Sequence, residues 1–210
     1  MCIKVNEIFR SIQGEGKYIG YLHLFLRFSG CNIRCAYCDT DHSGYQSYSS
    51  SELIKKIGQQ GDFRTLSLTG GEPLIQAEAI LPMIERLDCE ILLETNSTLP
   101  DNLKMVLPYV HIISADYKPF FHRFNYSLFH EFISLASEKE CYIKIVFGKD
   151  SDIAQDIEKI MHDFPNIPLF IQPVSPFSAD DISYGAQMIE EFAGADIRLI
   201  PQIHPVLDIR

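Results

Sequence analysis

Residues 29–42 read Ser-Gly-Cys-Asn-Ile-Arg-Cys-Ala-Tyr-Cys-Asp-Thr-Asp-His, with cysteines at positions 31, 35 and 38. Cysteine thiolates are the soft ligands that iron–sulfur clusters prefer, and a [4Fe–4S] cluster has four irons to ligate. Three cysteines leave one iron without a protein ligand, and a small molecule can bind there. Cys31, Cys35 and Cys38 therefore predict a cluster that takes part in catalysis rather than one that only carries electrons.

Two simpler interpretations of the three cysteines stay open at this point. Their i, i+4, i+7 spacing also fits one face of a helix, where cysteines pack as small apolar residues. Turn-forming residues such as Gly30 and Asn32 count against a helix. The other interpretation is a zinc site with His42 as the fourth ligand, although zinc folds usually take their ligands from two separated segments.

On both sides of this loop, short β-rich stretches alternate with helical stretches. The predicted strands are Leu22–Phe28, Thr65–Thr69, Glu90–Glu94, His111–Ala115, Tyr142–Phe147, Leu169–Gln172 and Ile197–Ile200. The predicted helices are Ser51–Gly61, Ile75–Leu87, Asn102–Leu107, Ser127–Lys139, Asp152–Phe164 and Ala179–Ala193. Such alternation indicates an α/β fold with parallel strands joined by right-handed crossovers. A closed eightfold barrel typically needs ~250 residues, so this chain predicts an open, partial (β/α) barrel of about six parallel strand–helix units.

The composition predicts one domain that spans residues 1–210, since apolar residues make up 46% of the chain. The 28 acidic residues outnumber the 18 basic ones and give a net charge of −10, which argues against binding to nucleic acid or anionic lipid. No apolar run approaches the ~20 residues that span a bilayer. The first residues also lack a signal-peptide pattern. We therefore expect a cytoplasmic protein.

Polar motifs follow several of the predicted strands. They are Ser67–Pro73, Glu94–Thr98, Ser114–Pro119 and Gln172–Ser175. In the first of them, Gly70 and Gly71 allow a ligand to approach the backbone closely, and Glu72 offers an acceptor for an ammonium group. Because the carboxyl ends of parallel strands share one rim, we expect these motifs to converge on the cysteine loop.

The Cys-x3-Cys-x2-Cys loop after the first barrel strand, with Gly70-Gly71-Glu72-Pro73 after the second, resembles the radical S-adenosylmethionine (SAM) superfamily. That resemblance implies that the open iron binds the amino and carboxylate groups of SAM. An electron from the reduced cluster would then split the sulfonium into methionine and a 5′-deoxyadenosyl radical. The protein would contribute orientation and the exclusion of side reactions.

A narrower resemblance rests on the stretches Glu7–Gly16 (EIFRSIQGEG), Arg27–Asn32 (RFSGCN) and Tyr37–Thr40 (YCDT). They are similar to the 7-carboxy-7-deazaguanine synthase family, and the likeness extends to Pro201–His204. The resemblance implies conversion of 6-carboxy-5,6,7,8-tetrahydropterin to 7-carboxy-7-deazaguanine with loss of ammonia. This carbon–nitrogen lyase reaction makes a precursor of queuosine and other 7-deazapurines, and it would regenerate SAM.

The resemblance also implies roles for single residues, with a substrate-binding segment at 1–20 and a cluster loop at 29–42. Cys31, Cys35 and Cys38 would hold the [4Fe–4S] cluster, and Thr40 would help bind Mg²⁺, a hard cation that suits oxygen ligands. SAM contacts would come from Tyr37, Cys38, Asp39, Gly71, Glu72, Ser114 and Gln172. Substrate contacts would come from Ile12, Gln13, Gly14, Arg27 and Thr69, with the Arg27 guanidinium paired to the substrate carboxylate.

Two further expectations concern partners and the C-terminal stretch. The family resemblance implies an electron donor of the flavodoxin or ferredoxin type, and we expect a homodimer. The family often reads Gln-x-His-Lys near its end, whereas Pro205 follows His204 here and puts a cation at that position in doubt. Family chains can close the pocket with their extreme C-terminus, so the resemblance allows Arg210 to reach the site.

Other functions share parts of this pattern. An activase for a glycyl-radical protein has the cysteine triplet and Gly-Gly-Glu-Pro, but it lacks the Ser11–Gly16 entry and needs an open groove for a protein loop. A zinc-stabilised binding module would contain zinc without iron or sulfide. A ferredoxin-like carrier would have four cysteine ligands and a cluster that SAM does not perturb.

Overall fold

The computed structural model of the chain describes residues 1–35, 38, 44–118, 124–148 and 151–208. In this part of the chain, nine strands form one sheet in the order β3-β1-β2-β4-β5-β6-β7-β8-β9. The strands are β1 (Ile3–Ile12), β2 (Leu22–Phe28), β3 (Gln46–Tyr48), β4 (Thr65–Gly70), β5 (Glu90–Thr95), β6 (Ile112–Tyr117), β7 (Glu140–Phe147), β8 (Leu169–Pro173) and β9 (Ile197–Leu199).

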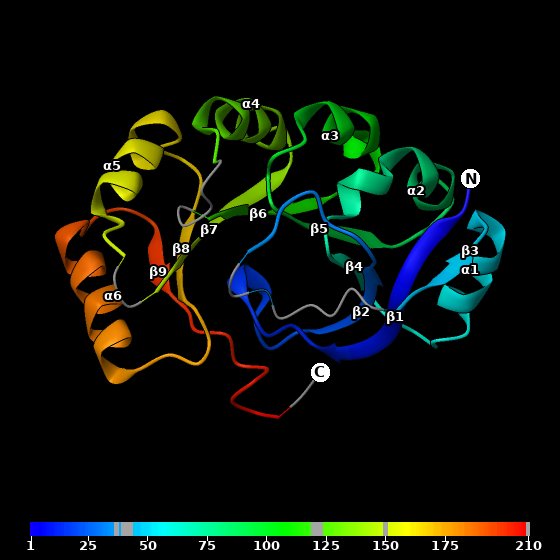
Figure 1. Cartoon of the computed structure of the whole chain (residues 1–210), viewed down its shortest axis with the longest axis horizontal. Coiled ribbons are helices and arrows are strands. Elements are labelled where there is room, and N and C mark those ends of the chain that lie inside the picture. Colours follow the sequence, from blue (N-terminus) through cyan, green and yellow to red (C-terminus); the bar gives the residue numbers. More distant parts are fainter. Residues whose placement is uncertain (36–37, 39–43, 119–123, 149–150, 209–210) are drawn as a thin grey trace.

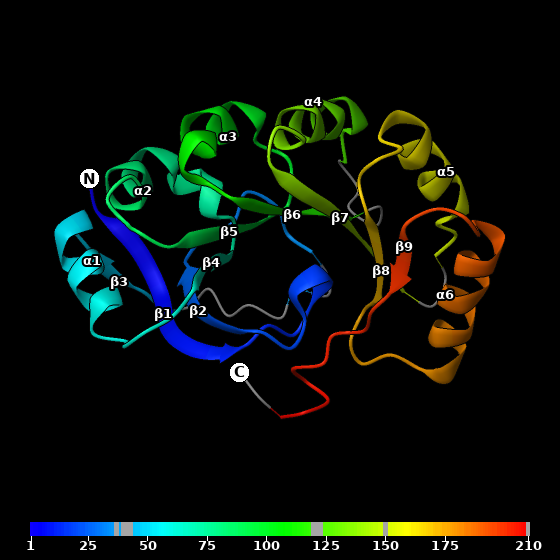
Figure 2. The same ribbon diagram turned by 180° about the vertical axis from the view of Figure 1, so that it is seen from behind.

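The helices lie on the outer side of this sheet, which curves into an incomplete ring (Figures 1 and 2). They are α1 (Ser50–Gly58), α2 (Ala77–Ile84), α3 (Pro100–Val106), α4 (Tyr126–Ala136), α5 (Ala154–Asp163) and α6 (Ala179–Glu191). Three short 3₁₀ helices accompany them: η1 (Gly16–Tyr18), η2 (Pro73–Gln76) and η3 (Leu107–Tyr109). None of the helices in the described ranges is long and apolar enough to cross a membrane.

The open, partial barrel predicted from the sequence is confirmed. Strand β2 pairs in parallel with β4, and the parallel pairing continues strand by strand to β9. All seven predicted strands are present, within a few residues of their expected ends.

Strands β1 and β3 were not predicted, and both pair in antiparallel fashion at the edge of the sheet. The apolar pattern of β1 is interrupted because its register with β2 shifts between Val5 and Glu7. A bulge of this kind moves the following side chains to the other face and breaks the period of two that identifies a strand. Strand β3 has three residues, too few for a periodic signal.

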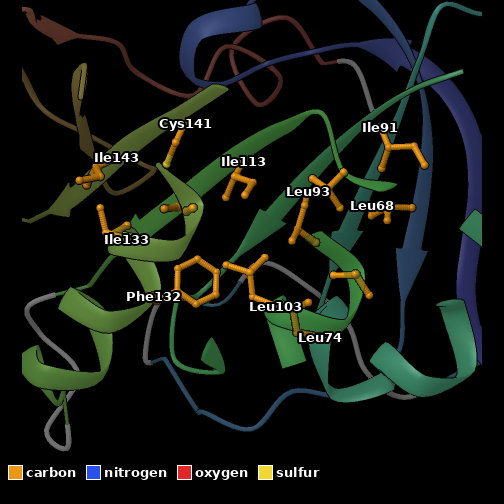
Figure 3. Packing of buried hydrophobic residues seen from close by; sticks show 14 of the residues in the cluster. Leu68, Leu74, Ile91, Leu93, Leu103, Ile113, Phe132, Ile133, Cys141 and Ile143 are labelled. Atoms are coloured by element: carbon orange, nitrogen blue, oxygen red, sulfur yellow. The ribbon is translucent and has the colours of Figure 1, made fainter. Parts of the chain in front are cut away.

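The main core lies between the sheet and the helices. Every second residue of each strand points outward into it, as Figure 3 shows for Leu93 of β5 and Ile113 of β6, which face Leu103 of α3 and Phe132 of α4. All four side chains are fully buried. Burying a side chain of this size stabilises the fold by about 1.5–3 kcal/mol relative to leaving it exposed.

A smaller apolar cluster fills the inside of the barrel at the amino ends of the strands. Its buried members are Leu92, Ile112, Tyr142 and Phe170, and Tyr18 of η1 packs against them. The Tyr18 hydroxyl and Lys17 Nζ both donate to Glu140 Oε1, at 2.5 and 2.7 Å. In the described part of the chain, helix η1 therefore covers this end of the barrel, and the carboxyl ends of the strands form its open end.

Gly16 makes this closure possible. Its φ is +61°, and a Cβ placed there would lie 2.7 Å from the Tyr142 ring. A larger residue would push η1 away from the apolar cluster. The residues just before Gly16 are thereby held above the cluster, where they face the open end.

Candidate active site

A cavity of about 950 Å³ opens at the carboxyl ends of the parallel strands. It is lined by the cysteine loop, by the ends of β2 and β4 to β8, by the turn after β1, and by residues 202–205. This is the rim on which the sequence predicted the polar motifs to converge. The chain's first and last described segments both contribute to its wall.

Cys31, Cys35 and Cys38 all line this cavity. Burial raises the pKa of the Cys31 and Cys35 thiols, whereas Cys38 is exposed. Three soft thiol donors in one loop fit an iron–sulfur cluster. Among the described residues, no group of three His, Cys, Asp or Glu side chains is placed to hold a single metal ion. In a [4Fe–4S] cluster each cysteine ligates a different iron, so this finding does not bear on the cluster.

Several predicted site residues lie outside the described residues. They are Tyr37, Asp39, Thr40, His42 and Arg210. The Mg²⁺ role of Thr40, the SAM contacts of Tyr37 and Asp39, and the zinc alternative through His42 therefore stay predictions.

The two glycines after β4 join the cysteine loop to the rim. Gly70 has a φ of +108°, and a Cβ there would lie 2.5 Å from the Phe28 carbonyl oxygen, so only glycine fits. Gly71 lines the cavity and donates its backbone N–H to that same oxygen at 3.1 Å. The backbone N–H of Glu72 donates to Gly30 O at 2.9 Å, directly before the first cysteine.

The Glu72 side chain does not reach the cavity, although the sequence predicted a SAM contact. It is fully buried and accepts hydrogen bonds from Asn96 N at 2.7 Å, Thr95 Oγ1 at 2.9 Å and Leu74 N at 3.0 Å. Burial raises the pKa of this carboxyl to about 7, against the lowering effect of those three donors. The geometry makes Glu72 the acceptor that holds the turn after β5.

A buried lysine joins two acidic residues on the inner wall. Lys144 Nζ of β7 lies 2.6 Å from Glu15 Oε2 and 3.1 Å from Asp116 Oδ1. Burial alone would lower the pKa of Lys144, but Asp116, Glu15 and Glu94 raise it well above its usual value. Lys144 is therefore charged, and its ammonium offsets the burial of Glu15, whose pKa is held at about 2.

Glu94 of β5 forms a second acidic group on the same wall. Gln13 Nε2 donates to its Oε1 at 2.7 Å, and Thr69 Oγ1 donates to its Oε2 at 2.6 Å. Burial raises the pKa of Glu94. The predicted substrate residues Gln13 and Thr69 are thus brought together, and the carboxylate that connects them was not among the predicted contacts.

Arg27 of β2 also lines the cavity, as predicted. Its Nε lies 3.7 Å from Glu7 Oε2, and its guanidinium carbon lies 5.3 Å from the centre of the Phe9 ring. The Nε atom is buried and has no hydrogen-bond partner among the described residues. A guanidinium held in this way can present its remaining N–H groups to an anion.

The C-terminal stretch packs against the turn after β1. Ile203 N donates to Gly14 O at 3.0 Å, and Gln202 Nε2 donates to Glu15 Oε1 at 2.5 Å. A Cβ on Gly14 would lie 2.7 Å from His204 Nδ1, so this contact needs glycine. Ile12, Gly14 and Pro205 line the cavity, and the predicted likeness over Pro201–His204 thus falls on a wall of the site.

The two weaker predictions for SAM contacts differ in outcome. Gln172 of β8 lines the cavity, and its Oε1 is buried without a hydrogen-bond partner among the described residues. Ser114 of β6 is fully buried and does not line the cavity. Lys118, which follows β6, was not predicted as a site residue. It lines the cavity, and its Nζ lies 2.9 Å from Asp116 Oδ2. Its charge partly offsets the rise that burial causes in the pKa of Cys31 and Cys35.

The chain is similar to known proteins along most of its length. Residues 26–118 match the Radical SAM superfamily model. The protein named 7-carboxy-7-deazaguanine synthase from Methanopyrus kandleri is 34% identical to the chain, and the match covers 98% of the chain and 94% of that protein. The protein of the same name from Methanothermobacter thermautotrophicus is 31% identical, and the match covers 98% of the chain and 97% of that protein. A third protein of this name, from Thermoplasma acidophilum, is 33% identical to the chain, and the match covers 97% of the chain and 96% of that protein.

A solved structure has the same fold. The crystal structure of QueE from Escherichia coli superimposes with a TM-score of 0.72 and 23% identity, covering 96% of this chain and 94% of that one.

Proposed function

The chain belongs to the 7-carboxy-7-deazaguanine synthase family, and we propose that it converts 6-carboxy-5,6,7,8-tetrahydropterin to 7-carboxy-7-deazaguanine and ammonia. The loss of ammonia accounts for every atom that distinguishes the two ring systems, so the conversion needs no net oxidant or reductant. The family implies a [4Fe–4S] cluster and SAM, which supply the radical that begins the reaction when they are bound.

The observation that carries this proposal is the distribution of charge in one cavity. A pterin has a hydrogen-bond-donating amino-pyrimidinone edge at one end and, in this substrate, a carboxylate at the other. The cavity offers the half-buried carboxylates of Glu15 and Glu94 as acceptors and the Arg27 guanidinium as a partner for an anion.

The two glutamates retain acceptor capacity for such a ligand. A carboxylate has about four lone-pair sites that can accept hydrogen bonds, and among the described residues Glu94 accepts from the side chains of Gln13 and Thr69. Both donors fix the orientation of the Glu94 carboxylate, and Lys144 and Gln202 do the same for Glu15. Preorganised acceptors lose little freedom when a ligand binds, which favours affinity and a single ligand orientation.

The cluster and SAM would lie at the other side of the cavity. Cys31, Cys35 and Cys38 would hold the cluster, and the backbone of Gly71 would approach SAM closely. Lys118 supplies a cation on this side, suited to the SAM carboxylate. Gln172, with its buried carbonyl oxygen, would accept a hydrogen bond from SAM.

Finer features of the proposal rest on the family resemblance. We propose that Thr40 helps bind Mg²⁺ and that Tyr37 and Asp39 contact SAM. A flavodoxin- or ferredoxin-type protein would supply the electron, and the chain would act in the cytoplasm as one domain. Exposed Tyr21 and Leu22, beside the closed end of the barrel, favour a homodimer formed through that end.

An anaerobic assay tests the function directly. The reconstituted protein is mixed with SAM, Mg²⁺, dithionite and the carboxypterin, and the products are identified by mass spectrometry. We expect 7-carboxy-7-deazaguanine and one ammonia for each product, with SAM regenerated. The Cys89→Ala variant is the matched control for cysteine substitutions, since Cys89 precedes β5 outside the cavity lining.

The same preparation distinguishes the other candidate functions. A colourless protein that contains zinc but no iron or sulfide would indicate a zinc module. A radical placed on a partner protein, with the carboxypterin left unchanged, would indicate an activase. A cluster whose EPR spectrum does not respond to SAM would indicate an electron carrier.

A further inference from the structure

A closed hydrogen-bond network lies beside the first cysteine of the loop, and no role in the proposed reaction accounts for it. It consists of Asn32 in the loop and Asn96 and Thr98 in the turn after β5. Asn96 Nδ2 donates to Asn32 Oδ1 at 2.8 Å and to Cys31 Sγ at 3.8 Å. Asn32 Nδ2 donates to Thr98 Oγ1 at 2.8 Å, which joins the turn to the loop.

The orientation of the Asn96 amide is fixed by its partners. Its Oδ1 accepts from Thr98 N at 3.2 Å and from Thr98 Oγ1 at 2.6 Å. A backbone N–H can only donate, so this side of the amide must be the oxygen. The NH₂ group is consequently directed at Cys31 and Asn32.

The backbone of the turn is held just as firmly. Asn96 N donates to the buried Glu72 carboxylate at 2.7 Å, and Thr95 Oγ1 donates to the same carboxylate. Ser97 follows with a φ of +60°, a left-handed conformation that is unfavourable for a residue with a side chain. The surrounding contacts therefore hold the turn in this strained conformation, and the turn places the Asn96 amide beside Cys31.

We propose that Asn96 is a positioning residue that donates a hydrogen bond to the Cys31 sulfur of the bound cluster and raises the cluster's reduction potential. A donor to a cluster sulfur stabilises the more negative, reduced state more than the oxidised one. Asn96 is 6% exposed, so water cannot replace the donor easily when it is removed. The inference rests on the proposed function, because it requires that Cys31 ligate a cluster.

The test is an EPR-monitored redox titration of the cluster-loaded protein without substrate. The Asn96→Ala variant removes the donor, and we expect its midpoint potential to fall. A tenfold lower ratio of reduced to oxidised cluster at a fixed potential, about 59 mV for one electron, is the expected size. The matched control is Asn102→Ala, whose amide donates to Leu74 O at 2.8 Å in a neighbouring segment and does not line the cavity.

A second variant keeps the test independent of folding. Thr98→Val leaves the Asn96 amide in place but removes the hydroxyl that orients it, and we expect a smaller fall in potential. The inference is overturned if the Asn96→Ala protein contains the full amount of iron and sulfide and its cluster has the same midpoint potential as that of the Asn102→Ala protein. If the unaltered protein binds no cluster, the proposed function fails instead, so the two failures are distinguishable.

Discussion

The two faces of the curved sheet differ in chemistry although the same strands form both. On β6, Ile113, Ala115 and Tyr117 belong to the core beneath the helices, whereas the alternate residues Ser114 and Asp116 face inward. On β7, Ile143 and Ile145 face outward and Lys144 faces inward, toward the acidic residues of the cavity. The outer face is held by apolar contacts, whereas the inner face combines the apolar cluster at the amino ends of the strands with charge pairing toward the carboxyl ends.

The difference shows which face determines stability and which determines activity. An outward side chain can be replaced by another apolar residue of similar volume at little cost. An inward side chain such as Lys144 cannot, because removing one partner leaves a buried charge uncompensated. We therefore expect substitutions on the outer face to lower stability alone, and substitutions in the cluster loop to lower activity alone. Substitution of a buried charged residue such as Lys144 should lower both.

The strongest test of this separation is Cys35→Ala. Loss of one thiolate is expected to abolish cluster binding and all turnover, while the melting temperature stays close to that of the unaltered protein because Cys35 is no part of the main core. Iron and sulfide analysis and thermal unfolding measure the two effects. Cys89→Ala should retain both cluster and activity. A folded Cys35→Ala protein that still turns over would contradict the assignment of the cluster loop.

On the outer face, Phe132→Ala should lower the free energy of unfolding by about 3–5 kcal/mol, since it leaves a cavity in the main core. Denaturant unfolding measures this effect. Leu128→Ala on the same helix is the control, because Leu128 is 39% exposed and should contribute much less. Equal effects of the two substitutions would mean that the core does not lie where the structure places it.

On the inner face, Arg27→Ala should weaken binding of the carboxypterin by about 2–4 kcal/mol, since it leaves the substrate carboxylate without a partner in a dry pocket. That loss corresponds to a roughly 30- to 1,000-fold higher dissociation constant. Equilibrium binding and KM measure it. Arg10→Ala is the control, since Arg10 is exposed, does not line the cavity and donates a hydrogen bond to Gln60 O at 3.3 Å. An unchanged KM for Arg27→Ala would contradict its role.

Glu72, which lies between the two faces, predicts a pH dependence of stability. Its pKa is about 7 in the folded protein against a usual 4.5, so between these pH values the folded state holds a proton that the unfolded state has released. Stability from this group is therefore present below pH 4.5 and is lost as the pH rises toward 7, by up to roughly 3 kcal/mol.

The Glu72→Gln variant tests this dependence. It should flatten the stability profile between pH 4.5 and 7, with an added pH-independent loss from weaker acceptance of the three hydrogen bonds. Glu15 has the opposite sign, since its pKa of about 2 makes stability fall as the pH drops below 4.5. A profile that Glu72→Gln leaves unchanged would show that this carboxyl does not titrate in that range.

The outer face could be predicted from the sequence because its signal is local. Alternating apolar residues identified Leu22–Phe28 and Tyr142–Phe147 as strands, and their order along the chain implied a parallel, open barrel. The cysteine loop was predicted for a similar reason, since its three ligands lie within eight residues.

The inner face could be predicted only in part because its partners are distant in sequence. Glu15 and Lys144 are 129 residues apart, and Glu15 and Gln202 are 187 apart, so no periodic pattern links them. For Glu72, the local sequence signal was misleading. Its position after two glycines suggested a ligand contact, but its carboxylate accepts hydrogen bonds from Thr95 and Asn96 in the turn after β5.

The contact between Ile203 and Gly14 has a consequence for how the protein is made. Its partners are separated by nearly the whole length of the chain. During translation, β1 through β8 can leave the ribosome and pack their hydrophobic layer before residues 202–205 complete this wall of the pocket. Catalytic competence is therefore acquired only after residues 202–205 have been synthesised, later than the scaffold that supports it.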